Sequence, residues 1–424
     1  MRINIPYGNN WLSSDIPDKN LVDIQSRQQP SGVRNLAEFV EFAINNPIAS
    51  GNLSDFVRPG KKISIVVNDI TRPIISSKVL PPLLRELRRI GVSESDITIL
   101  IATGVHRPNT AEEQSSILGN VSRDIKVINH QAKNENTLSD LGYTRNGIPV
   151  RINRVFAESD VKILTGLISP HQQSGFAGGR KSVLPGIASY ESIRIYHSFP
   201  ICPRDIAIGR IDGNVAHQES LEAARMVGID FIVNVVPNSR DEVFKVVAGE
   251  LHEAWMEGVR SWKENLEVTI SEYADITIAS PGGYPRDINF WQSQKAIASA
   301  ELITKSGGII ILVAQCIEGL GEENLRWFEW LIEASTPAEV IERFEKVGYV
   351  NGSGKAFCFA RGLKEFKIMV VSEYLDKRLL QSMFFEKYDN VQIALNNAIN
   401  EMGKDARIAI LPRAVEFLPT LEST

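Results

Sequence analysis

Residues 169–197 hold the densest group of side chains that could take part in catalysis. The segment contains His171, Lys181 and His197, and a glycine-rich stretch, GFAGGRKSVLPG, begins at residue 175. Glycines let the backbone turn tightly and approach a ligand closely. A lysine in such a loop can bind phosphate, form a Schiff base or anchor a cofactor, and histidines can transfer protons or bind metal. These residues predict a ligand site, with the ligand left open.

The glycine-rich stretch departs from a phosphate-binding P-loop at one position. The pattern G-x-x-x-x-G-K-[ST] nearly fits residues 175–182, but Arg180 stands where the pattern requires its second glycine. That glycine lets the backbone curl around phosphate, and a β-carbon with a guanidinium group would obstruct the curl. A nucleotide triphosphatase is therefore only a weak alternative.

Three further loops place polar side chains directly after a predicted strand. They are residues 68–73 with Asp69 and Arg72, residues 103–108 with His106, and residues 281–287. His106 alone could equally cap the next helix, but three histidines in or beside such loops favour catalysis. Ligands of open α/β sheets bind beyond the carboxyl ends of the strands. We therefore expect one active site in a cleft between two domains.

A predicted helix after the last of these loops carries a second set of polar side chains. Within residues 289–303, Trp291, Gln292 and Lys295 fall within about one turn, and Gln292 and Lys295 share a face. A solvated helix face has the same pattern, but the preceding loop favours a contribution to the site. The remaining histidines, His130, His217 and His252, lie in polar or helical surroundings and are predicted to be structural.

Short apolar runs alternate with helix-length segments through most of the chain. This pattern predicts two α/β domains with mostly parallel sheets. We place the N-terminal domain at 1–268 and the C-terminal domain at 269–424, the last residues of which could pack back on the first domain. Strands are expected at 63–67, 97–101, 124–128, 161–168, 230–236, 243–247, 274–280, 308–313, 367–371 and 407–411, and helices at 79–90, 251–266, 337–347 and 391–402.

The composition is that of an ordinary globular protein. Of 424 residues, 43% are hydrophobic and 23% charged, and the formal net charge of −5 provides no basic surface for nucleic acid. The N-terminus lacks a secretory signal and no apolar run is long enough to span a membrane. We expect a cytoplasmic protein without nucleic-acid or membrane partners. Cys202, Cys316 and Cys358 are far apart, which disfavours disulfides and a thiolate zinc site.

Several of these segments occur in an order and spacing typical of one enzyme family. They are IPYG at 5–8, DITRP at 69–73, TGVHRP at 103–108, PH at 170–171, GFAGGRKSVLPG at 175–186, the histidine at 197, and FWQSQKA at 290–296. Each segment alone is a weak signal, but the combination is specific. Together they resemble the nickel-dependent lactate racemase family.

The resemblance implies a cofactor, an activity and roles for the matching residues. The cofactor is a nickel pincer nucleotide, a pyridinium-3-thioamide-5-thiocarboxylate mononucleotide with nickel, bound covalently at Lys181. His197 would supply the protein's ligand to nickel, and His106 and His171 would be the acid/base pair. Arg72, Gln292 and Lys295 would hold substrate carboxylate or cofactor polar groups, and Asp69, Thr71 and Trp291 would support the cofactor. The implied partners are a small 2-hydroxy acid and, transiently, cofactor-biosynthesis enzymes.

The residue types fit racemisation by hydride transfer. The α-hydrogen beside an ionised carboxylate is a very weak acid, so removing it as hydride avoids a carbanion, while a histidine takes the hydroxyl proton. The enantiomers present the hydroxyl in different places, which explains a need for two histidines. Nickel held by carbon and sulfur needs only one protein ligand, so a cluster of Cys and His is not required.

Departures from the family pattern concern the expected substrate pocket. Gln172, Gln173 and Ser174 follow His171 where apolar or aromatic residues and alanine are commoner, and Trp291 replaces a tyrosine. Gln172 and Gln173 are therefore candidate substrate-binding residues. We expect lactate or another short-chain 2-hydroxy acid as the substrate, with 2-epimerisation of a polyhydroxy (sugar) acid as the alternative. More distant alternatives are a histidine-ligated zinc hydrolase and a non-catalytic ligand-binding protein.

Overall fold

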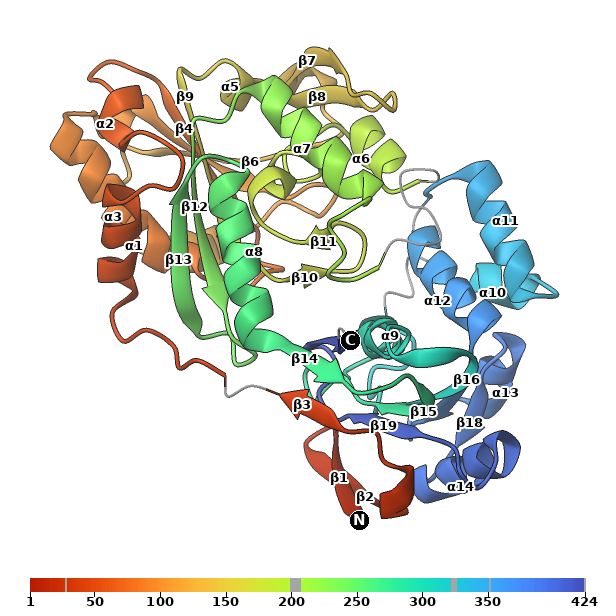
Figure 1. Cartoon of the computed structure of the whole chain (residues 1–424). Coiled ribbons are helices and arrows are strands. Elements are labelled where there is room, and N and C mark those ends of the chain that lie inside the picture. The colour runs from red at the N-terminus through yellow and green to blue at the C-terminus, as the bar shows by residue number, and fades with distance from the viewer. Residues whose placement is uncertain (27–28, 199–206, 322–325, 351, 423–424) are drawn as a thin grey trace. The chain divides into compact units, whose positions relative to one another are not determined.

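The chain divides into two compact units, each built around a parallel sheet (Figure 1). The computed structural model describes residues 1–26, 29–198, 207–321, 326–350 and 352–422. The N-terminal unit comprises residues 29–197 and 209–265, and the C-terminal unit comprises the described residues of 1–28, 198–208 and 266–424. Residues 1–26 thus belong with the C-terminal unit, whereas the sequence pattern places them in the first domain. Their strand β3 (Ile24–Ser26) pairs with β14 (Glu267–Ile270), a long-range pairing that explains the difference.

The N-terminal unit has a six-stranded sheet. In spatial order its strands are β13 (Val243–Gly249), β12 (Phe231–Pro237), β9 (Val161–Leu167), β4 (Ile63–Asn68), β5 (Ile97–Ala102) and β6 (Lys126–Asn129). Neighbouring strands are parallel except β12 and β13. The predicted α/β fold with mostly parallel sheets is therefore confirmed.

Helices cover both faces of this sheet. Helices α1 (Leu36–Asn45) and α3 (Ser76–Ile90) pack on one face against alternate strand residues such as Ile65 and Ile99. Helix α8 (Glu253–Leu266) lies along the other face, where Gly258 allows close contact with Val236 and Val247 (Figure 1). Burial on both faces explains why these strands are almost continuously apolar.

Shorter elements complete the N-terminal unit. Its other helices are α2 (Leu53–Phe56), α4 (Ala111–Leu118), α5 (Arg154–Ala157), α6 (Tyr190–Tyr196) and α7 (Val215–Val227). Two hairpins join β7 (Leu138–Tyr143) to β8 (Pro149–Asn153) and β10 (Pro170–His171) to β11 (Gly175–Phe176). The 3-10 turn η4 (Gly179–Ser182) follows the second hairpin and contains Lys181.

The C-terminal unit is built around a five-stranded, wholly parallel sheet. Its strand order is β18 (Glu386–Tyr388), β17 (Lys367–Val371), β16 (Thr304–Val313), β15 (Ala274–Ala279) and β19 (Ile408–Leu411). Further strands are β1 (Arg2–Tyr7), β2 (Asn10–Asp15) and β20 (Leu418–Leu421), and the helices are α9 (Phe290–Ala300), α10 (Glu329–Glu333), α11 (Pro337–Val347), α12 (Ser353–Glu365), α13 (Lys377–Ser382) and α14 (Val391–Met402). β20 pairs with β14 inside this unit.

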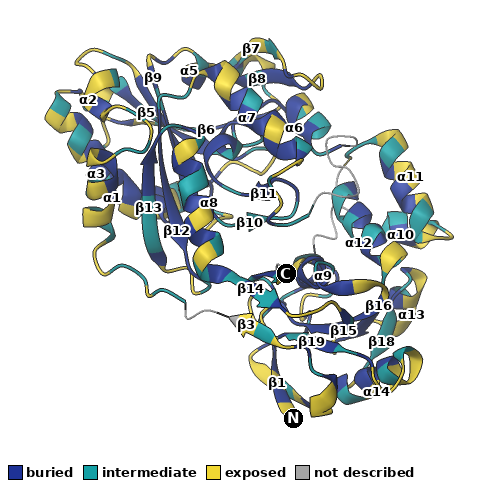
Figure 2. Ribbon diagram, viewed as in Figure 1, coloured by how far each residue is buried: buried dark blue, intermediate teal, exposed yellow. Residues whose placement is uncertain are grey.

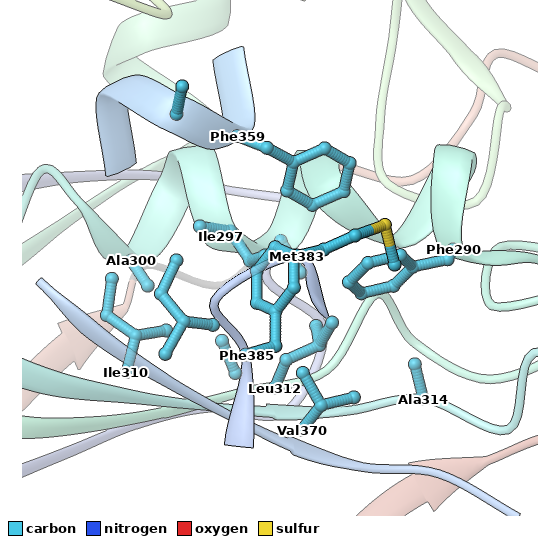
Figure 3. Close-up of a cluster of buried hydrophobic side chains, with 14 of the residues drawn as sticks. Phe290, Ile297, Ala300, Ile310, Leu312, Ala314, Phe359, Val370, Met383 and Phe385 are labelled. Atoms are coloured by element: carbon cyan, nitrogen blue, oxygen red, sulfur yellow. The ribbon is translucent and has the colours of Figure 1, made fainter. Parts of the chain in front are cut away.

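An aromatic cluster fixes α9 and α12 against this sheet (Figure 3). The Phe290 and Phe359 rings stack at 4.8 Å, and Trp327 stacks on Phe359 at 5.1 Å. The other face is covered by α14 and by β1, and both faces of the sheet are buried (Figure 2). Because α9 carries Trp291, Gln292 and Lys295, this packing positions the predicted polar set.

Two expectations from composition can be compared with the described residues. None of the helices in the described part of the chain is long and apolar enough to cross a membrane. Cys316 and Cys358 are free thiols, and Cys202 lies outside the described residues.

Replacing Phe359 by alanine should destabilise the C-terminal unit by about 3–5 kcal/mol, because a fully buried ring is lost and a cavity remains. Denaturant unfolding followed by tryptophan fluorescence measures the change, and Phe42→Ala, at a 69% exposed phenylalanine of α1, is the control. Equal, small effects of both substitutions would contradict this account of the core.

Candidate active site

Three adjacent strands deliver the loops that carry most of the predicted catalytic residues. β4 lies between β5 and β9, and all three run parallel. Asp69 follows β4, His106 follows β5 and His171 follows β9, so the loops leave the sheet side by side at its carboxyl edge. The sequence predicts that these loops lie at the same edge of a sheet, and the structure confirms this for the three loops of the N-terminal unit.

His106 and Asp69 form a hydrogen-bonded pair. His106 Nδ1 lies 2.7 Å from Asp69 Oδ2, and the Thr71 hydroxyl donates to Asp69 Oδ1 at 2.6 Å. Burial raises the pKa of Asp69, but the hydrogen bonds from His106 and Thr71 outweigh it, so the pKa lies below its usual value. An ionised carboxylate accepts the Nδ1 hydrogen, which leaves the lone pair of His106 on Nε2. The half-exposed His106 is therefore oriented as a base.

His171 is held in the opposite tautomer. Its Nδ1 lies 3.2 Å from the backbone N–H groups of both Gln173 and Ser174, so Nδ1 accepts and the hydrogen of the neutral ring is on Nε2. Burial and the positive charges of Lys181 and Arg72 hold the pKa of His171 well below its usual value. Once protonated, His171 would therefore give up a proton readily.

The amine of Lys181 has a lowered pKa, which favours its neutral form. Burial first, and then the charges of Arg72 and Arg180, hold its pKa well below the usual lysine value. A neutral amine is a nucleophile, whereas an ammonium group is not. Lys181 can therefore form a covalent bond to an electrophilic group.

His197 ends α6 and has a fixed ring orientation. Its Nδ1 lies 2.8 Å from the Ile193 carbonyl, which can only accept, so Nδ1 carries the hydrogen and Nε2 the lone pair. Burial, with smaller contributions from the charges of Lys181 and His106, lowers the pKa of His197 to about 4. A neutral imidazole with an oriented Nε2 is the form that binds metal ions.

The pKa shifts also show that these side chains lie near one another. The charge of Lys181 influences His171 and His197, that of Arg72 influences His171 and Lys181, and that of His106 influences His197. Five predicted site residues therefore form one electrostatically connected group in the N-terminal unit.

Arg180 closes the glycine loop from inside, which the sequence did not reveal. Its guanidinium donates to the carbonyls of Gly178, Ser174 and Phe176 at 2.9–3.3 Å, and its centre lies 3.8 Å from the Trp255 ring. Burial lowers the pKa of Arg180 to about 9. The guanidinium is bound by the loop's own carbonyls, which agrees with the expectation that an arginine at this position obstructs a phosphate-binding curl.

Glycine is required where this loop passes the sheet. Gly178 has φ +80°, and a β-carbon there would lie 2.8 Å from the Leu167 carbonyl oxygen. The side-chain oxygen of Asn234, on β12, accepts a hydrogen bond from the backbone N–H of Gly179 at 2.8 Å. The loop that carries Lys181 is therefore attached directly to the central strands.

The C-terminal unit contains the second predicted set. The Asn289 side chain caps α9 by accepting the Gln292 N–H, and Lys295 donates to Gln292 Oε1 at 2.7 Å. Lys355 on α12 lies 4.9 Å from the Trp291 ring centre, a contact that no sequence motif indicated. Whether these residues share one active site with the N-terminal group stays a prediction.

The two glutamines after His171 differ in what they can offer a substrate. Gln173 is buried and its side-chain amide donates to the Tyr196 carbonyl at 2.7 Å, so its amide nitrogen is engaged inside the protein. The amide nitrogen of Gln172 is buried and has no hydrogen-bond partner among the described residues. The structure therefore favours Gln172 over Gln173 as the substrate-binding candidate.

The remaining histidines have structural environments, as predicted. His130 is buried, its Nε2 lies 2.8 Å from the Ala188 carbonyl, and burial lowers its pKa to about 4. His217 and His252 stack on Trp255. Within the described ranges, no three His, Cys, Asp or Glu side chains are grouped so that they could hold a metal ion.

Comparison with known proteins identifies the family. Residues 7–207 match the lactate racemase N-terminal domain and residues 269–418 the lactate racemase C-terminal domain. The chain is 32% identical over 423 residues to the lactate racemase of Thermoanaerobacterium thermosaccharolyticum, covering 98% of each chain. It is also 32% identical over 418 residues to the lactate racemase of Lactiplantibacillus plantarum, covering 97% of each. A lactate racemase is an isomerase.

Solved structures agree with the sequence matches. The lactate racemase apoprotein of T. thermosaccharolyticum superposes with a TM-score of 0.89 at 32% identity, covering 99% of this chain and 100% of that one. A Thermotoga maritima protein, 19% identical with a TM-score of 0.62 over 93% of this chain and 100% of its own, shares the fold. With both domain matches in order and relatives aligned over nearly its full length, this chain belongs to the lactate racemase family.

Proposed function

We propose that this protein is a racemase of 2-hydroxy acids that acts by reversible hydride transfer to a nickel pincer nucleotide attached to Lys181. The observation that supports this most strongly is the grouping of a low-pKa lysine with three histidines in different protonation environments. Two curated relatives are named lactate racemase, which makes lactate the first substrate to test.

The residues fit such a cofactor. Lys181, whose pKa is held well below the usual lysine value, would provide the amine for the covalent link, and His197 would present Nε2 as a single protein ligand. A metal held mainly by the carbon and sulfur of its own cofactor would require no cluster of protein ligands. When bound, the group would supply a reversible acceptor for the hydride on C2, so that a planar 2-keto acid could take the hydride back on either face.

Side chains of the protein would transfer the protons of the reaction and stabilise its charges. His106 Nε2 would take the hydroxyl proton of one enantiomer, and the Asp69 carboxylate would stabilise the resulting imidazolium. His171 would have to take up a proton before it could protonate the oxygen as the other enantiomer forms, and its low pKa favours release of that proton. In the reverse direction His171 would have to accept a proton, which requires the backbone N–H groups of Gln173 and Ser174 to release Nδ1, because Nε2 already carries the hydrogen of the neutral ring. Arg72 would hold the carboxylate, and Gln292 and Lys295 stay predicted contacts of the substrate carboxylate or of cofactor polar groups.

The test of this proposal is racemisation by nickel-loaded protein. Enantiopure lactate and other 2-hydroxy acids, including a sugar acid for the epimerase alternative, are incubated with protein produced alongside the cofactor-synthesis enzymes. Chiral chromatography should show formation of the opposite configuration at C2. Loaded protein that leaves every acid unchanged would contradict the proposed function.

Lys181→Ala and His106→Ala should separate metal retention from catalysis. Loss of the amine removes the covalent link, so the first variant should lose nickel and activity together. The second should keep its nickel and lose racemase activity by about 10²-fold or more, as expected for a general base. Metal analysis of the purified proteins and chiral assays measure both. Loss of nickel only from the His106 variant would mean that the two roles are wrongly assigned.

Asp69→Asn should lower kcat/KM by on the order of 10²- to 10⁴-fold, because an amide no longer fixes the Nδ1–H tautomer of His106. The nickel content should be unchanged. Asp124→Asn, at an exposed aspartate, is the control. An unimpaired Asp69→Asn enzyme would show that this carboxylate does not orient the base.

The amine of Lys181 should react at lower pH than other lysines. In cofactor-free protein, its acetylation rate should rise with pH and level off well below pH 10.4, where an ordinary lysine is still half protonated. Peptide mass spectrometry after brief labelling with acetic anhydride at graded pH provides the rates. A profile that matches the average lysine would contradict the low pKa.

A further inference from the structure

The ring of Trp255, on α8, packs directly against the loop that leads into Lys181. Its indole N–H donates to the Ala177 carbonyl at 2.8 Å. A β-carbon at Gly179 would lie 3.1 Å from Trp255 Cδ1, so the backbone of the loop touches the ring. Trp255 is fully buried and has no part in the mechanism proposed above. Helix α8 therefore contacts, through this side chain, the loop that carries the proposed attachment point of the cofactor.

The same ring lies against Arg180, a buried cation whose charge no carboxylate balances. Within the described ranges no acidic side chain forms an ion pair with Arg180, and its Nε atom has no hydrogen-bond partner. Its two terminal nitrogens donate to three carbonyls of the loop, those of Ser174, Phe176 and Gly178. The guanidinium centre lies 3.8 Å from the centre of the Trp255 ring. The face of the ring thus supplies an attraction that a carboxylate would otherwise supply.

The other aromatic neighbours of Trp255 add no positive charge beside Arg180. His217 lies on α7, which packs against η4, and its ring stacks on Trp255 at 5.3 Å with 17° between the planes. Burial first, and then the charges of Arg180 and His252, lower the pKa of His217 to about 3, so its ring is neutral near pH 7. The ring of His252 stacks at 6.2 Å. Stacked rings from two segments of the chain therefore keep the Trp255 ring in place.

The contact with Trp255 bears on Lys181 because Arg180 and Lys181 are consecutive. Both belong to the 3-10 turn η4, so the backbone that fixes one side chain also directs the other. The bond from the Gly179 N–H to Asn234 ties this backbone to β12 but does not involve the guanidinium. The charge of Arg180 also contributes to the low pKa of Lys181, after burial and Arg72.

We propose that Trp255 is a positioning residue for Lys181, and that it acts by holding the guanidinium group of Arg180 against the carbonyls of the loop. Trp255 does not contact the reacting atoms and is not a catalytic residue. The positioning can be measured in protein without cofactor. Its consequence for attachment of the nickel pincer nucleotide rests on the proposed function.

The experiment measures two properties of the full chain without cofactor. Hydrogen–deuterium exchange of peptides from residues 174–186 reports how firmly the loop is held, and the pH midpoint of Lys181 acetylation reports the surroundings of the amine. In Trp255→Leu, exchange in this segment should be roughly 10-fold faster or more. The midpoint should move up by about one pH unit or more, because the amine becomes better hydrated and the charge of Arg180 is no longer held beside it.

Three further variants show whether the effect is specific. Trp255→Phe keeps an aromatic face for Arg180 and should retain much of both properties, although it loses the bond to Ala177. Arg180→Lys keeps the charge without the planar group that stacks on the ring, and should loosen the loop as Trp255→Leu does. Phe156→Leu alters a fully buried ring of α5 in the same unit and should leave both properties at their wild-type values.

A double-mutant cycle tests whether Trp255 acts through Arg180. Arg180→Met removes the cation that the ring binds and should by itself raise the acetylation midpoint. Adding Trp255→Leu to Arg180→Met should then raise the midpoint little further, since two residues that act through one contact are not additive. Fully additive shifts would show that Trp255 does not act through Arg180 and would overturn the inference.

The inference would also be wrong if folded Trp255→Leu kept the wild-type exchange and midpoint, or if Phe156→Leu changed them equally. Should Trp255→Leu fail to fold, wild-type exchange and midpoint in Arg180→Lys would overturn it instead. In protein produced with the cofactor-synthesis enzymes, intact mass spectrometry should show a smaller modified fraction for Trp255→Leu than for wild type. Wild type without an adduct on Lys181 would contradict the proposed function but not the positioning, which is measured without cofactor.

Discussion

The parallel alignment of β5, β4 and β9 is the constraint on which the site depends. Because these strands are neighbours with the same direction, the loops that follow them must leave the sheet together. Asp69, His106 and His171 are brought together in this way although about 100 positions separate the first from the last. Their chemistry then differs through local hydrogen bonds, with a carboxylate at one ring and backbone N–H groups at the other.

Burial first, and positive charge within this group second, disfavour the protonated forms of Lys181, His171 and His197. Arg180 is held by backbone carbonyls and by Trp255, and its charge adds to that of Arg72 in disfavouring a protonated Lys181. The same field disfavours protonation of His171. The low pKa values of Lys181, His171 and His197 therefore have burial as their main cause, and nearby positive charge adds to it. Arg180 acts here by positioning the loop and by its charge, without being a catalytic residue.

The sequence predicted the regular part of the fold well, since strands buried on both faces have a clear apolar pattern. The segments at 63–67 and 367–371 are examples that the structure reproduces as β4 and β17. Long-range pairing leaves no such pattern, which is why residues 1–26 were placed in the other domain although β3 pairs with β14. Contacts with backbone carbonyls or with distant helices are not predictable from local sequence either. The sequence analysis names Arg180 and Gln173 but not the carbonyls to which they donate, and it does not name Lys355, because these contacts depend on packing that local sequence does not encode.

The proposed function makes Lys181 the position that defines the chemistry. Mass spectrometry of intact active protein and of its peptides, combined with metal analysis, tests this claim most directly. The account predicts a sulfur-containing mononucleotide adduct on Lys181 together with stoichiometric nickel. A fully active protein in which Lys181 is unmodified would contradict it.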